Sequence, residues 1–405
     1  MTSQRNLTAG RAWGLAAVSA LMVAACGSGS APQLPGHVSP APAASASASS
    51  VPVPGASEPA GFEPAAVSFV SPSRGWVLGR SGCQDCAGLR LSGDGGDHWT
   101  VLPAPPAPLG YYSSSANAVT DVAFADAANG FLHGPGLLAT HDGGRSWIRQ
   151  PLPPVQALSV GTGHAYALTQ TQPAGPAGLW RTIIGSSRWT RLALPPGAGP
   201  PPAGSGESYG TLLLSAEGGT VVLLRSGFTG PTVTPGQVGR LWASSDSGTD
   251  WQARPVPCTP PDGGGAAVIS IALRHPDAWL LDCFNDEQSS QEQNTQHRLY
   301  GTIDAGLSWV RLPDPSRHND PGLLADNGSG HAFLATEGGA DTLVGTFDAG
   351  MHWQTLIRSG GSFSGWADLS FLNAGTGFVV GPTQYSPEHV YRTDDGGRTW
   401  HVLHL

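Results

Sequence analysis

The chain has 405 residues and a formal charge of −9, with 57 Gly, 36 Pro and only 12% charged residues. This composition, together with 13 Trp, favours many short strands and tight turns over long helices. The sequence contains no lysine, which excludes a lysine Schiff base and a phosphate-binding P-loop. The thinly spread negative charge argues against a nucleic-acid-binding surface.

The N-terminal segment has the pattern of an export signal. Arg5 and Arg11 precede an apolar run over residues 12–25, which is shorter than a membrane-spanning helix requires. The run ends in Val-Ala-Ala-Cys26-Gly, which resembles the lipobox of bacterial lipoproteins. The resemblance implies a signal peptide over residues 1–25 and a lipid on Cys26 that anchors the exported protein to the outer face of the cell membrane. Ordinary secretory cleavage that leaves Cys26 as a thiol, and a retained transmembrane segment, are the alternatives.

Residues 26–64 are rich in Ala, Pro, Ser and Gly. Such a segment buries too little apolar surface to offset the entropy of ordering it. We therefore expect a disordered tether here and a folded body over residues 65–405.

One motif, Ser/Thr-x-Asp-x-Gly-x-x-Trp, recurs along the folded body. Its hydroxyl and carboxylate can accept hydrogen bonds from backbone N–H groups of their own turn, and its Gly can adopt a positive φ. The Trp is expected to open the next strand and to pack its ring back over the turn. We interpret the Asp residues as structural. A decayed copy keeps only Thr182 and Trp189, and the six intact copies contain Asp94 and Trp99, Asp142 and Trp147, Asp246 and Trp251, Asp304 and Trp309, Asp348 and Trp353, and Asp395 and Trp400.

Each motif closes a repeating unit of four strands. Two runs of alternating apolar residues lie upstream of the motif, as at 66–70 with 75–79 and at 367–371 with 377–381. The motif then forms the turn between the third and fourth strands. Steps of 42–62 residues from one Trp to the next match the blades of a propeller. The sequence therefore predicts an all-β, seven-bladed β-propeller, and its end at His401–Leu405 shows no strand exchange that would close the ring.

The motif resembles the Asp-box, also called the bacterial neuraminidase repeat. The wider spacing V-x-F…G-[WF]-V-x-G…T-x-D-G-G-x-[ST]-W, with close copies at Thr140–Trp147 and Thr393–Trp400, resembles the photosystem II stability and assembly factor of plants and cyanobacteria. That resemblance implies a non-enzymatic propeller that binds membrane-protein partners, although the family's basic arginine patch has no clear equivalent here. Sortilin-type receptors, which bind peptides with a larger Asp-box propeller, also favour recognition.

The long connections mark a candidate binding face. Because consecutive strands run antiparallel, the motif turns share one face with the turns between first and second strands, and the remaining connections share the other. Aromatic residues on these connections can stack on sugars or anchor a protein, although covering the rim of the channel is the alternative interpretation. The polar stretch Asn285–His297 is interpreted as a solvated insertion without a role. The candidate aromatic residues are Tyr111, Tyr112, Tyr209, Phe228, Phe363 and Tyr385.

The four remaining cysteines are predicted to form two local disulfides, Cys83 with Cys86 and Cys258 with Cys283, as suits an exported protein. The C-x-x-C pair lacks the helix that typically follows a thiol-redox motif, and a four-cysteine zinc site would require pairs separated by three blades to meet. The histidines show no metal-binding pattern, so we predict no metal and no cofactor. A G-x-S-x-G match at Ser208 lacks the strand–helix context of a nucleophile elbow.

Two functions of different classes follow. The favoured one is a monomeric, lipid-anchored recognition or assembly module for a protein or glycan partner, without catalysis and without nucleic acid. The alternative is an exported glycoside hydrolase of the exo-sialidase or glucanase type, which requires two carboxylates that converge near the central channel. The Arg-Ile-Pro signature of sialidases does not occur in the sequence, and sialidases have six blades instead of seven.

Overall fold

The computed structural model describes the chain from residue 61 to residue 405, and all of these residues belong to the second of its two units, Ala48–Leu405. Gaps in the description fall at 111–114, 171–176, 200–211, 226–238, 259–264, 290–291, 314, 316–321, 337–341, 359–365 and 382–388.

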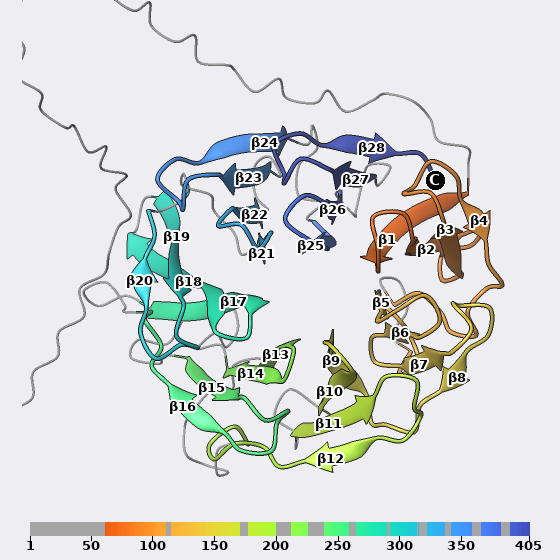
Figure 1. The fold of residues 1–405 in the computed structure, drawn as a ribbon, viewed down its shortest axis with the longest axis horizontal. Helices are drawn as coiled ribbons and strands as arrows, with labels where there is room; N and C mark the ends of the chain where they lie inside the picture. Colours follow the sequence, from red (N-terminus) through yellow and green to blue (C-terminus); the bar gives the residue numbers. More distant parts are fainter. Residues whose placement is uncertain are drawn as a thin grey trace, which may run out of the picture. The chain divides into compact units, whose positions relative to one another are not determined.

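The described residues form seven antiparallel sheets of four strands, which are arranged as blades in a ring (Figure 1). The predicted seven-bladed β-propeller is therefore confirmed. In chain order the blades are β1–β4 (Phe62–Phe69, Gly75–Ser81, Ala87–Ser92, Thr100–Val101), β5–β8 (Asp121–Phe124, Gly130–His133, Leu137–Thr140, Ile148–Arg149), β9–β12 (Val155–Val160, His164–Gln170, Ala177–Ile183, Thr190–Leu192), β13–β16 (Leu212–Glu217, Thr220–Arg225, Arg240–Ser244, Gln252–Arg254), β17–β20 (Gly265–His275, Ala278–Ser289, Glu292–Thr302, Val310–Arg311), β21–β24 (Gly322–Asp326, Ala332–Thr336, Thr342–Thr346, Gln354–Arg358) and β25–β28 (Asp368–Phe371, Gly377–Val380, Val390–Thr393, His401–Leu403).

A Phe–Gly pair explains the first hairpin of several blades. Phe69 ends β1 and pairs across the strands with Gly75, which begins β2. A Cβ on Gly75 would lie 2.4 Å from the Phe69 ring, so only glycine leaves room for the ring to cover the opposite strand. Phe124 with Gly130, and Phe371 with Gly377, repeat this arrangement. The V-x-F…G pattern of the sequence is therefore a packing rule for the turn between first and second strands.

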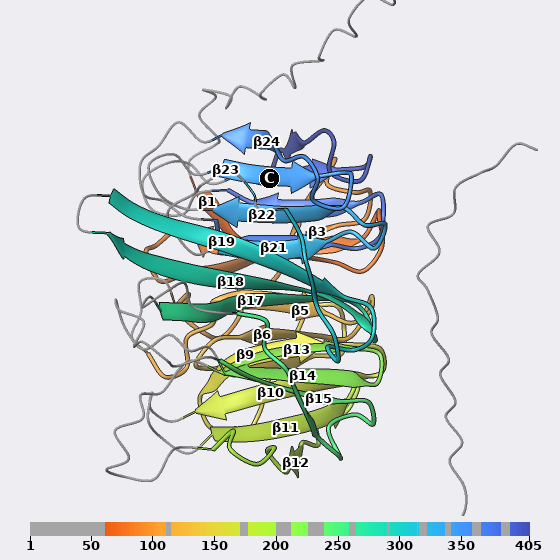
Figure 2. The ribbon, with the colours of Figure 1, turned by 90° about the vertical axis from the view of Figure 1, so that its left-hand side faces the viewer.

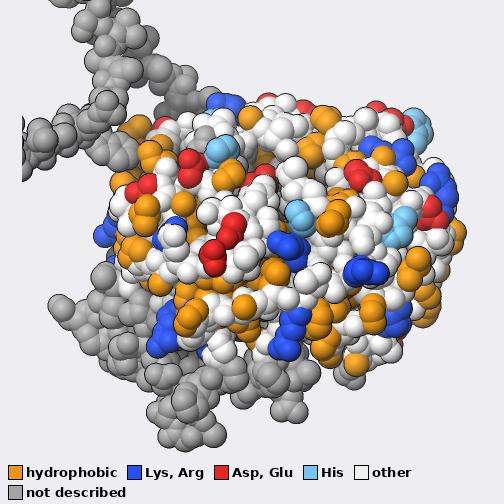
Figure 3. Space-filling view, turned by 60° about the horizontal axis from the view of Figure 1, so that its bottom comes forward, with side chains coloured by type: hydrophobic (Ala, Val, Ile, Leu, Met, Phe, Trp, Pro, Cys, Tyr) orange, Lys and Arg blue, Asp and Glu red, His pale blue; other side chains and the backbone are white. Residues whose placement is uncertain are grey.

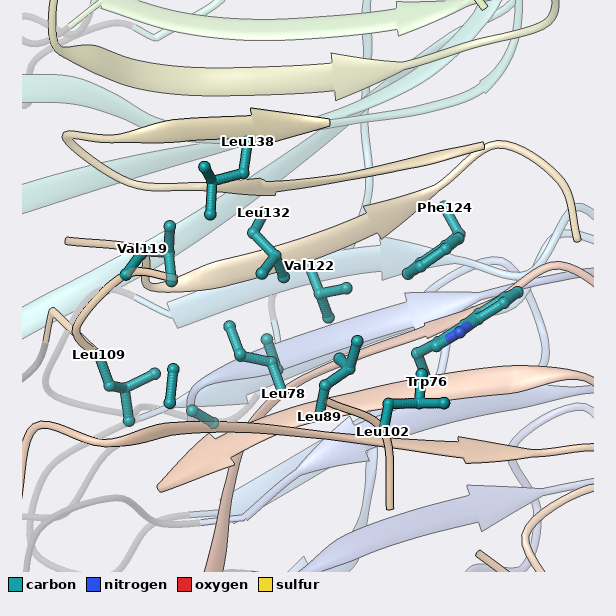
Figure 4. Packing of buried hydrophobic residues seen from close by; sticks show 14 residues of the cluster. Trp76, Leu78, Leu89, Leu102, Leu109, Val119, Val122, Phe124, Leu132 and Leu138 are labelled. Carbon is teal, nitrogen blue, oxygen red and sulfur yellow. The ribbon is translucent and has the colours of Figure 1, made fainter. Parts of the chain in front are cut away.

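The hydrophobic core is divided into clusters that lie between neighbouring blades. In the cluster between blades 1 and 2, Trp76 stacks on Phe124 with ring centroids 3.6 Å apart, and Leu78, Leu89 and Leu132 are buried beside them (Figure 4). Burial of each such side chain contributes roughly 1.5–3 kcal/mol. Each cluster between neighbouring blades contains one motif tryptophan. Starting from the joint between blades 7 and 1 and ending at the joint between blades 6 and 7, these residues are Trp99, Trp147, Trp189, Trp251, Trp309, Trp353 and Trp400.

The ring closes without strand exchange in the described residues, because the first and last sheets each contain four consecutive strands. Side chains join the two blades instead. Phe69 of β1 stacks on Phe378 of β26 with centroids 3.8 Å apart, inside a buried cluster shared by both blades. The backbone N–H of Val67 donates to Asp368 Oδ2 at 3.1 Å, and Arg392 donates to the Gly95 carbonyl. The closing joint therefore uses the same kind of packing as the other six.

Both predicted disulfides are present, Cys83–Cys86 in the β2–β3 connection and Cys258–Cys283 between the end of blade 4 and β18. Disulfides of this kind fit an oxidising compartment outside the cytoplasm. In the part of the chain that the structure describes, no helix is long and apolar enough to cross a membrane.

The polar stretch Asn285–His297, which the sequence placed in a long connection, is instead mostly paired strand. β18 runs to Ser289 and β19 begins at Glu292, so most of this stretch is a paired hairpin with register from Phe284↔His297 to Ser289↔Glu292. The two strands extend past the ends of the neighbouring strands (Figure 2). Polar residues with low strand propensity form this extension because backbone pairing continues from the buried part of the sheet.

Candidate functional site

The six Ser/Thr-x-Asp turns connect the third and fourth strands of their blades. In each turn, the Asp carboxylate accepts hydrogen bonds from groups of the same turn. Asp142 Oδ1 accepts from the Thr140 hydroxyl at 2.8 Å and from the backbone N–H groups of Arg145 and Ser146 at 3.0 and 2.9 Å. The hydrogen bonds of the Ser146 hydroxyl and backbone hold the pKa of Asp142 at about 2. Such turns leave little free carboxylate for chemistry.

The other five turns repeat these bonds. Hydrogen bonds from His98 and Ser92 hold the pKa of Asp94 at about 2, and those from Ser308 and His352 do the same for Asp304 and Asp348. The pKa values of Asp246 and Asp395 are lowered as well.

The motif tryptophans also act between blades, a contact that the sequence did not suggest. Trp251 donates its Nε1–H to the Ala193 carbonyl of the preceding blade at 3.2 Å. Trp309 reaches Pro255 at 2.9 Å and Trp353 reaches Pro313 at 3.0 Å in the same way. Trp400 is the exception among these, since its Nε1–H bonds to Gly397 of its own turn at 3.0 Å.

This role explains why the decayed copy keeps its first and last residues. Trp189 donates to the Gln150 side chain of blade 2 at 3.0 Å, and it lies in the cluster between blades 2 and 3. The buried Thr182 hydroxyl lies within 3.1 Å of the carbonyls of Ser186 and Arg188 and thereby holds the turn without a carboxylate. The tryptophan therefore contributes to the packing between blades, whereas the Asp stabilises only its own turn.

A cavity of about 460 Å³ opens at the centre of the ring. Its walls come mainly from the innermost strands of blades 1, 2, 3, 4 and 7, namely β1, β5, β9, β13 and β25, with His133 of β6 and Phe378 of β26. The titratable residues that line it are Asp121, His133, Glu217 and Asp368. Three carboxylates and one imidazole make the cavity acidic, in contrast to the apolar clusters between the blades.

Two of these carboxylates influence one another. Burial and the nearby charge of Asp121 raise the pKa of Asp368 to about 7. Burial also acts to raise the pKa of Asp121, but the charge and hydrogen bond of His133 outweigh it and leave that pKa below its ordinary value. His133 Nε2 lies 3.4 Å from Asp121 Oδ2. Because 45% of the Asp121 side chain faces the open cavity, solvent reduces the energetic effect of these shifts.

The polar residues of the cavity also join the blades. Asp368 Oδ2 accepts from the Val67 N–H, Ser68 Oγ accepts from the Phe124 N–H at 2.9 Å, and Ser159 Oγ accepts from the Ala216 N–H at 2.9 Å. Each bond connects the innermost strand of one blade to that of the next. Because innermost strands have an open edge towards the channel, these side chains satisfy backbone groups that would otherwise depend on water.

Sequence reasoning did not identify Asp121 and Asp368. They begin β5 and β25 and occupy equivalent positions in blades 2 and 7, on either side of blade 1. The available signal was an Asp at the same place in two otherwise apolar strands. Its significance was missed because the sequence alone does not show that the two strands meet at the channel.

The predicted binding residues cannot be placed. Tyr111, Tyr112, Tyr209, Phe228, Phe363 and Tyr385 lie outside the described residues, as do Cys26 and Ser208. The strand ends that their connections join do lie opposite the Ser/Thr-x-Asp turns, because every sheet is antiparallel with its strands in chain order. Within the described ranges, no group of three or more His, Cys, Asp or Glu residues is positioned to hold a metal ion.

The outer surface shows no single-sign field on the side that Figure 3 presents. Arginine, acidic and apolar side chains alternate there.

Comparison with known proteins supports the fold. No protein-family model and no curated protein matches the chain. The propeller domain of the Trilobed protease from Pyrococcus furiosus aligns with a TM-score of 0.55 over 85% of this chain and 98% of its own, at 7% identity. A prolyl endopeptidase aligns with a TM-score of 0.55 over 84% of this chain and 49% of its own, at 13% identity. YCF48 bound to a D1 peptide aligns with a TM-score of 0.45 over 71% of this chain and 81% of its own, at 17% identity.

Proposed function

We propose that the protein is a lipid-anchored, extracytoplasmic recognition module that binds a partner, a protein in the first instance, without catalysis. Cys26 would carry the lipid, and residues 27–61, which precede β1, would hold the propeller away from the membrane. The proposal rests on one element, on one face of the ring, that is longer than its counterparts in the other blades.

The observation that carries the proposal is the β18–β19 hairpin. Its strands have 12 and 11 residues, whereas the second and third strands of the other blades have four to seven. It lies on the face opposite the Ser/Thr-x-Asp turns and extends beyond the ring (Figure 2). Elements that project from a rigid scaffold are typical recognition surfaces.

The hairpin also has an open edge. β20 pairs only with Tyr300 and Gly301 of β19, so the stretch Glu292–Gln296 has no strand partner on its outer side among the described residues. An edge of this type can accept an extended peptide by main-chain hydrogen bonds. A protein partner that supplies such a segment fits this geometry better than a glycan does.

Photo-crosslinking in the producing cell tests the proposal. A benzophenone amino acid at Gln288 or Gln293 places the probe in the hairpin, and the same probe at Thr249 places it in a turn on the opposite face. We expect one protein to be captured from the hairpin positions and not from Thr249. Capture from neither hairpin position, or the same yield from both faces, would contradict the proposal.

The central carboxylates favour a second candidate, an exported glycoside hydrolase. Asp121 and Asp368 face one cavity, and their pKa values move apart, as do those of a general acid and its partner carboxylate. We rank this function second because Asp368 already accepts from Val67 N–H at the closing joint and Asp121 is engaged by His133. Turnover that disappears in an Asp121→Asn, Asp368→Asn double variant would reverse the ranking.

A further inference from the structure

The two disulfides differ in access. Cys258 and Cys283 are 2% and 0% exposed, and they lie in the cluster between blades 4 and 5. Cys83 and Cys86 are both exposed in the short connection between β2 and β3. An attacking thiolate must approach a sulfur atom directly, so only the second pair can react while the propeller stays folded.

A small cavity of about 240 Å³ adjoins the exposed pair. Cys83 lines it together with Arg80 and Glu63, whereas Cys86 does not. Arg80 Nε donates to Glu63 Oε2 at 2.9 Å, and the two side chains remain 30% and 41% exposed. A cation that shares a cavity with a sulfur atom favours the thiolate form of that sulfur. This favours Cys83 as the leaving group of the two.

The loop that carries the pair is held at several points. Ser81 N–H donates to the Cys86 carbonyl at 2.9 Å, and Leu109 N–H donates to the Asp85 carbonyl at 2.9 Å. Gly82 N–H donates to the carbonyl of Gly61, immediately before β1, at 3.2 Å. These backbone bonds do not depend on the disulfide, so the loop can keep its place when the bond is broken.

We propose that Cys83–Cys86 is a thiol–disulfide exchange site for an extracytoplasmic dithiol, whereas Cys258–Cys283 is a permanent structural bond. A thiolate of the dithiol attacks Cys86 Sγ and forms a mixed disulfide, and the Cys83–Cys86 bond breaks with its electron pair on Cys83 Sγ, in the cavity that Arg80 also lines. The second thiolate of the dithiol then attacks the first dithiol sulfur, which is bonded to Cys86 Sγ in the mixed disulfide, and Cys86 leaves as a thiolate. The dithiol is oxidised to a disulfide by two electrons, and its two thiol protons pass to Cys83 and Cys86. The site goes beyond the proposed recognition function and does not depend on it.

The two disulfides provide an internal comparison. The full-length protein is exposed to dithiothreitol at pH 7, free thiols are alkylated at intervals, and peptide mass spectrometry follows each cysteine separately. We expect Cys83–Cys86 to be reduced at least about tenfold faster than Cys258–Cys283, with unchanged circular dichroism. Equal rates for both bonds, or reduction only together with loss of the folded signal, would overturn the proposal.

Two variants test whether Arg80 affects the reduction rate by stabilising the leaving thiolate or only by holding the loop in place. Arg80→Gln removes the cation and should slow reduction of Cys83–Cys86 by about threefold, whereas Glu63→Gln removes its counter-charge and should accelerate it. Arg188→Gln, an exposed arginine of blade 3, should leave the rate unchanged. If Arg80→Gln and Glu63→Gln shift the rate in the same direction, the assigned role of Arg80 is wrong.

Discussion

Replacement of Asp368 by Asn should stabilise the protein at alkaline pH. The folded protein holds the proton of Asp368 up to a pKa of about 7, whereas the unfolded chain loses it near the ordinary value of 3.8. Unfolding therefore releases a proton between these values, and the contribution of this group to stability falls as the pH rises from 4 to 7. The amide in the Asp368→Asn variant would carry no charge, and its oxygen would still accept the Val67 N–H.

The size of the effect follows from the shift. A change from 3.8 to about 7 corresponds to about 4 kcal/mol without screening. Because the group faces a cavity open to solvent, we expect about 1–2 kcal/mol in practice. The free energy of unfolding in urea, followed by tryptophan fluorescence, should be higher for Asp368→Asn than for the wild type at pH 8, and the difference should be small at pH 4.5.

Asp121→Asn provides the coupled control, because it removes the charge that helps to raise the pKa of Asp368 and should flatten the pH dependence of the wild type. An Asp368→Asn variant that gains no stability over the wild type between pH 4.5 and 8, or that is less stable than the wild type at pH 8, would refute the electrostatic description of the channel.

Three further predictions concern the ring. Because the pKa of Asp142 is about 2 in the folded state and higher in the unfolded chain, its stabilisation is present above pH 4 and is lost towards pH 2. Asp142→Asn should therefore flatten the pH dependence of the urea midpoint in that range. Phe378→Ala should cost about 3–5 kcal/mol in unfolding free energy, as should Phe333→Ala at the preceding joint. Only Phe378→Ala should accelerate hydrogen exchange selectively in blades 7 and 1. Equal exchange in these blades in both variants would contradict closure of the ring by side chains. Trp353→Phe should cost about 1 kcal/mol through loss of its bond to Pro313, measured by urea unfolding.

The blade number was predictable from the sequence because the Ser/Thr-x-Asp turn is a local structure. Its hydrogen bonds act within seven residues, as the bonds from Thr140 and Ser146 to Asp142 show. The position of the tryptophan in the chain was predicted for the same reason. Its partner was not, because Trp353 contacts Pro313 only after two blades have docked.

The features that required the structure depend on contacts between distant segments. Asp121 and Asp368 face the same cavity because the ring brings blades 2 and 7 to either side of blade 1. The hairpin was missed because Asn285–His297 is polar, and strand propensity does not record the pairing that β18 and β19 inherit from their buried halves. The difference in access between the two disulfides likewise depends on tertiary packing.

The claim that this propeller recognises a partner without chemistry is tested most directly by a turnover assay on the full-length protein. Fluorogenic sialosides and glucosides, together with soluble glucans, cover the hydrolase alternative, and the Asp121→Asn, Asp368→Asn double variant serves as the matched control. We predict the same background rate of product release for both proteins. Product release by the wild type that is lost in the double variant would contradict the account.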